Sequence, residues 1–67
     1  MTRHRINRSH LTREQLRALD AAAAGDAYTH PDRGRVCRRL RALGLLVHDR
    51  WAPTSIGRSL ARVVVAS

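Results

Sequence analysis

The sequence predicts a mainly helical domain with about three helices and one short β-hairpin. Apolar residues recur at helical spacing in three stretches, a β-favouring stretch follows the second of them, and residues typical of helix ends separate them. With 67 residues, the chain has room for one small domain. Its core must consist mainly of Leu, Val, Ala and Ile, because the sequence holds one Trp, one Tyr and no Phe.

The first ten residues, MTRHRINRSH, are polar and cationic and show no apolar period. This composition predicts a flexible basic arm over residues 1–10, followed by the folded domain over residues 11–67. The arm lacks the apolar stretch of a signal peptide, and the longest apolar run, Val63–Ala66, is too short to cross a bilayer. We therefore expect a cytoplasmic protein without a membrane partner, from a bacterium or a phage-infected host.

The first helix is predicted from its start. Thr12 is a typical N-cap residue, Gln15 occupies the capping-box position, and Leu11 and Leu16 occupy the two hydrophobic-staple positions. Apolar positions at helical spacing and a run of four alanines continue the helix until Gly25 ends it.

The following segment, residues 26–30, is too short for a full helix, and its tyrosine, Tyr28, is predicted to fill the core. A second helix is expected from about Asp32 to Leu43, with Gly44 after its end. At helical spacing its apolar arc holds Val36, Cys37, Leu40 and Leu43. Its polar arc holds Gly34, Arg35, Arg38, Arg41 and Ala42.

Residues 45–48, LLVH, favour β structure and are followed by WAP at residues 51–53, so we expect a short hairpin. Pro53 marks the end of its second strand, because proline cannot donate a hydrogen bond to a neighbouring strand. Thr54 then caps a last helix. Its apolar positions are Ile56, Leu60, Val63 and Val64.

Two sequence motifs point to a known fold. CRRLRALGLL at residues 37–46 and WAPTSIGR at residues 51–58 resemble the L..LGLL and T..GR segments of small bacterial and phage winged helix-turn-helix domains. The resemblance covers about residues 11–64 and implies a DNA-recognition helix followed by a two-stranded wing. The sequence departs from the family at the usual second helix, which is compressed to about residues 26–30, so fewer contacts from it to the DNA backbone are expected.

The charge balance supports a polyanionic partner. Thirteen basic residues against five acidic ones give a net charge of +8, and every basic residue is Arg. The absence of Lys fits two explanations, codon bias in a GC-rich genome and selection for guanidinium chemistry. Under either explanation the surface carries planar, permanently charged groups suited to phosphates and guanine edges.

The arginines of the second helix are the strongest candidates for DNA contacts. Arg35 and Arg38 lie near its N-terminus, the part that usually enters the major groove deepest, so we expect them to contact bases. Arg41 shares their arc, and Arg33 and Arg39 flank it and would reach the DNA backbone. A solvated helix face is the competing interpretation, but five arginines between residues 33 and 41, with no acidic residue among them, favour DNA.

Four further positions and one glycine complete the expected interface. Gly34 would let the DNA backbone approach closely, and Arg50 at the wing tip would reach a minor groove or a phosphate. Arg3, Arg5 and Arg8 in the arm could follow phosphates or enter an adjacent minor groove. The alternative interpretation of Arg50 is a solvated turn residue. The alternative interpretation of the arm is an unstructured tail that keeps the protein in solution.

Other chemistry has little support in the sequence. The four histidines, His4, His10, His30 and His48, show no metal-ligand spacing, and Cys37 lies on an apolar helix face, where a buried thiol is expected. No catalytic set or Gly-rich phosphate loop is present, so we expect neither an enzyme nor a cofactor nor a small-molecule substrate.

The sequence thus predicts a double-stranded DNA-binding protein, sequence-specific or architectural, acting as a transcriptional regulator or a phage or mobile-element accessory factor. The main alternative is a protein-interaction module that binds a partner through its apolar C-terminal helix. A homodimer could form there through Val63, Val64 and Val65, because three adjacent valines cannot all face one side of a helix. RNA binding has less support, since surface aromatic residues for base stacking are missing.

Overall fold

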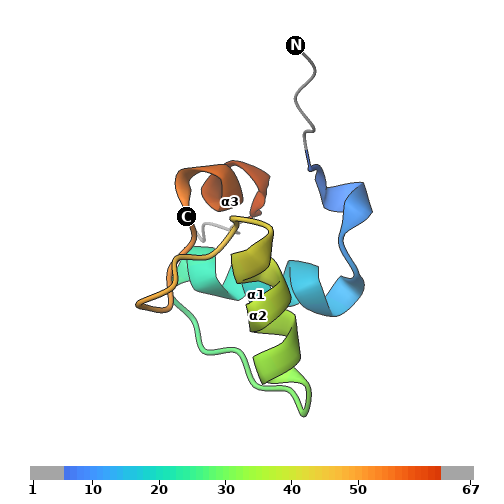
Figure 1. The fold of residues 1–67 in the computed structure, drawn as a ribbon, viewed down its shortest axis with the longest axis vertical. Coiled ribbons are helices and arrows are strands. Elements are labelled where there is room, and N and C mark those ends of the chain that lie inside the picture. The colour runs from blue at the N-terminus through green and yellow to red at the C-terminus, as the bar shows by residue number, and fades with distance from the viewer. Residues whose placement is uncertain (1–5, 63–67) are drawn as a thin grey trace, which may run out of the picture.

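The computed structural model describes residues 6–62, and within this range it has three α-helices and one short 3₁₀-helix (Figure 1). The 3₁₀-helix η1 (Arg8–His10) precedes α1 (Arg13–Ala24), α2 (Arg33–Ala42) and α3 (Ser55–Leu60). In the view of Figure 1, α2 crosses α1, and α3 lies above them. Both α2 and α3 pack against α1, which is therefore the centre of the fold.

Helix α1 begins and ends where the sequence predicts. The Thr12 hydroxyl accepts a hydrogen bond from the Gln15 amide at 3.2 Å, and the Gln15 side chain accepts one from the Thr12 amide at 3.0 Å. This reciprocal capping box satisfies two amides that have no partner inside the helix. At the other end Gly25 has φ +75°, the left-handed conformation that glycine adopts without strain.

The prediction of helix α2 is also confirmed, and each end of the helix lies within one residue of the predicted end. Gly44 has φ +77°, and the Leu45 amide donates to the Leu40 carbonyl at 2.9 Å, which closes the helix in a Schellman turn. Between α1 and α2 the chain forms no helix, and Tyr28 in this segment is buried, as expected. The usual second helix of a helix-turn-helix is therefore missing from the described chain.

The predicted β-hairpin wing is wrong. Residues 6–62 contain no β-strand, and the expected hairpin is reduced to an isolated antiparallel bridge between Leu46 and Pro53. Leu45 and Leu46 are both buried, so this stretch does not alternate between core and solvent as a half-buried strand does. Pro53 has no amide hydrogen with which to extend the pairing. We refer to residues 47–52 as the bridge loop.

Helix α3 has the predicted cap but is shorter than expected. The Thr54 hydroxyl accepts from the Gly57 amide at 3.1 Å, and the helix ends at Leu60. The expected continuation through Val63 and Val64 lies outside the described residues. Gly57 is required by packing, because a Cβ there would collide with the Leu45 carbonyl. Ile56, predicted to face the core, is instead 61% exposed.

The core lies where the three helices meet the chain after α2. Its fully buried large side chains are Leu19, Leu40, Leu45 and Leu46, together with Cys37. The described part of the expected arm, residues 6–10, is docked on this body, because Ile6 packs against the core. Arg3 and Arg5 lie outside the described residues.

Candidate nucleic-acid interface

Helix α2 has one buried face and one charged face. Cys37 and Leu40 are buried against α1, and they fix the orientation of the helix. The opposite side carries exposed arginines at spacings of three and four residues, so their side chains are neighbours. These are Arg35, Arg38 and Arg39, which together we call the α2 arginine face.

Within the described chain, none of these three arginines forms an ion pair. Helix α2 contains no acidic residue, Asp32 directly before it forms no ion pair with another described residue, and the two carboxylates of α1 are already engaged. Glu14 accepts a hydrogen bond from the Tyr28 hydroxyl at 2.9 Å, and Asp20 pairs with Arg8 at 2.9 Å. The charge of the α2 arginine face is therefore directed to the solvent.

Arg41 is not part of this exposed face, which corrects the sequence prediction. Its side chain is half-buried, and Nε donates to the Val47 carbonyl at 3.3 Å. Arg41 lies one helical turn after Cys37, at the edge of the buried face, where the chain returns past α2. Arg39, expected only at the flank, is the more exposed of the two.

Arg33 is held by the segment between α1 and α2. Its Nε donates to the Tyr28 carbonyl at 2.9 Å, and its guanidinium lies 5.2 Å from the centre of the Trp51 ring. Trp51 in turn stacks on Tyr28 and donates from Nε1 to the Asp26 carbonyl at 2.6 Å. Local sequence patterns do not predict this network of contacts, because its members are up to 25 residues apart. It fixes the bridge loop and the N-terminal end of α2.

Arg8 is likewise engaged within the protein. Its guanidinium binds both oxygens of Asp20, at 2.9 and 3.1 Å, and donates to the Leu60 carbonyl at 2.9 Å. The Arg62 amide donates to the same carboxylate. Burial raises the pKa of Asp20, but the hydrogen bonds from Arg8 and Arg62 outweigh it, so the pKa lies below its ordinary value. Arg8 thus ties η1, α1 and the end of α3 together.

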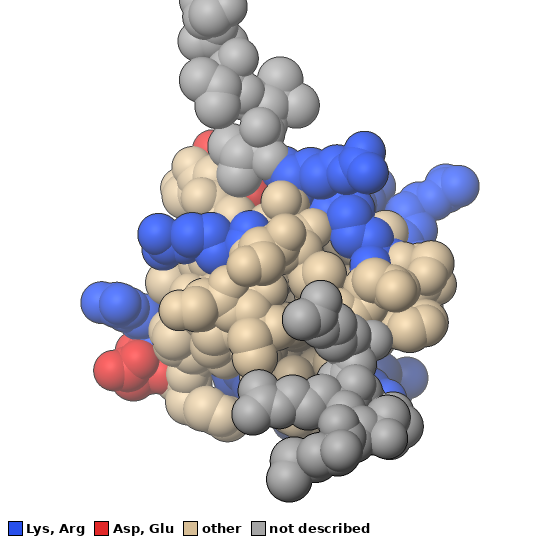
Figure 2. Space-filling view, turned by 90° about the horizontal axis from the view of Figure 1, so that it is seen from above, with Lys and Arg blue, Asp and Glu red and all other residues tan. Residues whose placement is uncertain are grey.

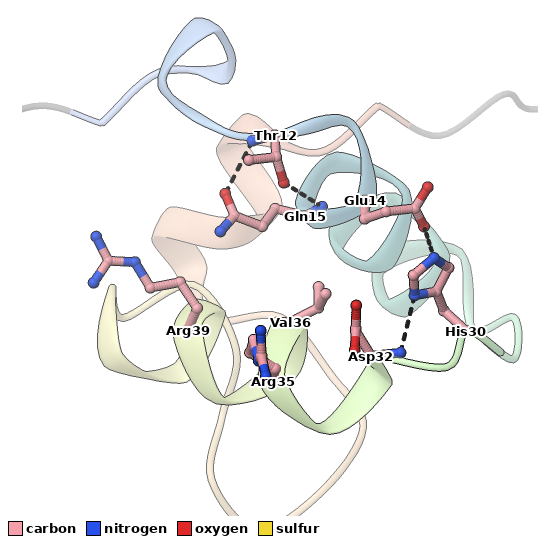
Figure 3. Close-up of a pocket in the computed structure, with 8 residues that line it drawn as sticks. All are labelled: Thr12, Glu14, Gln15, His30, Asp32, Arg35, Val36 and Arg39. Carbon is pink, nitrogen blue, oxygen red and sulfur yellow. Dashed lines mark hydrogen bonds and ion pairs between the residues drawn. The ribbon is translucent and has the colours of Figure 1, made fainter.

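A hollow of about 360 Å³ separates the start of α1 from α2 (Figure 3). Thr12, Glu14 and Gln15 line it from α1, and Arg35 and Arg39 stand on its α2 side. Two acidic residues, Glu14 and Asp32, line it together with these two arginines, so the hollow has no excess of positive charge for an anion. A polyanion would therefore meet the arginines on their outward side.

The polar groups at one end of this hollow satisfy one another. His30 Nδ1 accepts from the Asp32 amide at 3.1 Å, and His30 Nε2 lies 3.7 Å from Glu14. Burial, followed by the hydrogen bond to Glu14, raises the pKa of Tyr28 to about 12. These contacts join the segment before α2 to α1. Among residues 6–62 no three His, Cys, Asp or Glu side chains come together as a metal site would require.

The remaining predicted positions are accessible. Gly34 is exposed, and a Cβ added there would meet nothing within 4 Å, so packing does not require glycine. Arg50 is exposed in the bridge loop. Seen from above the fold, the molecule shows much more basic than acidic surface (Figure 2).

Comparisons with protein families, with curated proteins and with solved structures found no match to this chain. Within the described range no helix combines the length and the apolar character needed to span a membrane.

Proposed function

We propose that the protein binds double-stranded DNA through the α2 arginine face. The observation that carries this proposal is the set of three exposed guanidinium groups on one side of a helix whose other side is buried. No carboxylate of the described chain pairs with them. A rigid, unneutralised row of this kind suits a regularly spaced polyanion.

The dimensions of α2 fit the major groove, which admits one α-helix. Ten residues span about 15 Å of helix axis. Arg35 and Arg38, one turn apart, are placed to contact base edges, where arginine binds guanine through two hydrogen bonds. Arg39, on the neighbouring row, would bind a phosphate of the flanking strand. Such a protein would act as a regulator or as an architectural accessory factor.

Two engaged arginines support the interface without belonging to it. Arg33 fixes the start of α2 to Tyr28 and Trp51, and Arg41 fixes its last turn to Val47. Because both ends of the helix are held, the α2 arginine face is preorganised for its ligand, which lowers the entropy lost on binding.

The proposal is tested by fluorescence-anisotropy titration of a labelled duplex at about 50 and 200 mM salt. Each neutralised phosphate lowers the affinity about fourfold between these concentrations, so the phosphate contact of Arg39 predicts a fall of at least about fourfold for the natural protein. Arg35→Gln/Arg38→Gln removes the two base contacts and keeps the phosphate contact, so we expect much weaker binding with a salt dependence close to that of the natural protein.

The matched control is Arg13→Gln/Arg17→Gln, which removes the same charge from the side of α1 opposite its buried residues. It should retain most of the affinity, because a loss of net charge alone acts weakly at this salt concentration. The proposal fails if the natural protein does not bind duplex at about 50 mM salt, or if the control variant loses as much affinity as the α2 variant.

A protein-interaction role is the second candidate, favoured by Ile56, the one large apolar side chain that is exposed among the described residues. A hydrophobic contact would tolerate salt and would be lost on Ile56→Asp. The predicted dimer through the three C-terminal valines lies outside the described residues. Sedimentation of the natural protein and Ile56→Asp distinguishes this role, because only a contact through Ile56 predicts a change in mass.

A further inference from the structure

A second hollow, of about 500 Å³, lies between the bridge loop and α3. Arg50 lines it from the loop and Arg58 from the helix, and both side chains are exposed. In contrast to the hollow beside α1, no carboxylate lines it. Two arginines thus line a shared space, and neither forms an ion pair with a carboxylate of the described residues. We call this site the Arg50–Arg58 hollow.

The hydroxyl groups of this hollow differ in their availability. Thr54 donates to the Gly44 carbonyl and accepts from the Gly57 amide, so its hydroxyl is committed to the fold. Ser59 donates to the Ser55 carbonyl at 3.1 Å. The Ser55 hydroxyl makes no hydrogen bond to another described residue, which leaves it as a donor at the edge of the hollow. Two guanidiniums and one free hydroxyl suit the oxygens of a phosphate.

The hollow is joined to α2 through one residue. Val47 lines it, and the Val47 carbonyl accepts the hydrogen bond from Arg41 in the last turn of α2. The hollow therefore adjoins the last turn of the helix that carries the α2 arginine face. This adjacency favours a phosphate of a long ligand that also contacts α2 over a free phosphate ion.

We propose that the Arg50–Arg58 hollow binds one backbone phosphate of the DNA duplex that the α2 arginine face contacts. Arg50 and Arg58 hold its anionic oxygens together, and Ser55 donates a third hydrogen bond. This inference rests on the proposed function and adds Arg58 and Ser55, which the sequence alone does not place at the interface. The contact reads no sequence, so it sets affinity and orientation on the duplex.

The test compares the duplex affinity of Arg50→Gln, Arg58→Gln and the double variant by anisotropy, with Arg13→Gln as the matched control. Because both guanidiniums hold one phosphate, each single variant should lose several-fold in affinity, and the double variant less than the product of the two losses. The salt slope of the double variant should fall by about 0.9, the value for one phosphate, and not by about 1.8. Thermal unfolding by circular dichroism checks that these exposed substitutions leave the fold intact.

The outcomes separate the two proposals. If the natural protein does not bind duplex, both proposals fail. If it binds and Arg35→Gln/Arg38→Gln is impaired, but Arg58→Gln behaves like Arg13→Gln, only the hollow is refuted. Strictly multiplicative losses with a slope change near 1.8 would also refute the shared phosphate. If inorganic phosphate raises the unfolding temperature of the natural protein but not of the double variant, while duplex affinity is equal in both, the site takes a free ion and the proposal is overturned.

Discussion

The two halves of the chain use arginine in different ways. Residues 6–24 contain three arginines and two acidic residues, and both carboxylates there form ion pairs with arginine. Residues 25–62 contain eight arginines and three acidic residues, Asp26, Asp32 and Asp49. Charge in the first half is therefore largely balanced within the protein, whereas the second half carries an excess of positive charge.

The net charge of the chain is larger than the charge that is free to interact with a ligand. Arg8, Arg33 and Arg41 each donate to a backbone carbonyl of a distant or neighbouring segment, and they contribute to the fold. Their guanidinium groups join elements that also meet in the small hydrophobic core. The proposed binding sites use the exposed arginines of the α2 arginine face and of the Arg50–Arg58 hollow.

The largest effect is expected from a substitution in the core beneath the α2 arginine face. Leu40→Ala leaves a cavity beneath α2 and should lower the free energy of unfolding by about 2–5 kcal/mol, a large part of the stability of so small a domain. Urea unfolding followed by circular dichroism measures this loss, and duplex affinity should fall with it. Ile56→Ala, at an exposed position, is the control and should change stability little. A stable Leu40→Ala protein with full affinity would show that burial of this face does not organise the site.

The next largest effect is expected in the first half of the chain, where a substitution should lower the stability of the fold but not the affinity for duplex. Asp20→Asn removes the carboxylate that Arg8 and the Arg62 amide share, and it should cost about 1–3 kcal/mol of unfolding free energy at neutral pH. Duplex affinity should stay within about twofold, because a protein–DNA contact is not removed. A strong loss of affinity by the folded variant would place this pair in the interface.

The same pair predicts a pH dependence. The pKa of Asp20 is lower in the folded protein than its ordinary value of about 3.9, so ionised Asp20 stabilises the fold. This contribution is complete well above pH 4 and is lost as the pH falls through the ordinary range towards the lowered folded pKa. Urea unfolding at neutral and acidic pH should show a gap between the natural protein and Asp20→Asn that narrows in acid. A gap that does not change with pH would contradict the role of the ion pair.

The smallest effect is expected at Gly34, with opposite signs for stability and binding. Packing does not require glycine there, so Gly34→Ala should raise the free energy of unfolding by up to about 1 kcal/mol through helix propensity. If a DNA backbone approaches this turn closely, the added methyl group should weaken duplex binding several-fold. Thermal unfolding and anisotropy on the same sample measure both quantities. Equal or tighter binding would mean that the ligand does not come close to Gly34.

Local signals predicted the helices well. Thr12, Gly25, Gly44 and Thr54 cap or end helices where the sequence indicates, because caps depend on residues within one turn. The prediction of a hairpin was wrong because tertiary packing buries both Leu45 and Leu46. A β-favouring stretch of sequence does not reveal such packing.

The site was predictable only in part. The helical pattern identifies Arg35 and Arg38 as exposed, but it cannot show that Arg33 and Arg41 donate to carbonyls of adjoining segments. Arg58 was missed because its motif explains the fold, and its proximity to Arg50 depends on how α3 meets the bridge loop.

The contrast between the two halves is tested most directly by a ¹⁵N–¹H NMR titration of the natural protein with a short duplex. A shift or loss of amide signals in residues 33–42 and 50–59, with residues 13–24 unchanged on their outer face, is the result expected here. Changes confined to α1, or no change at equimolar duplex in low salt, would contradict the assignment of the second half of the chain to DNA binding.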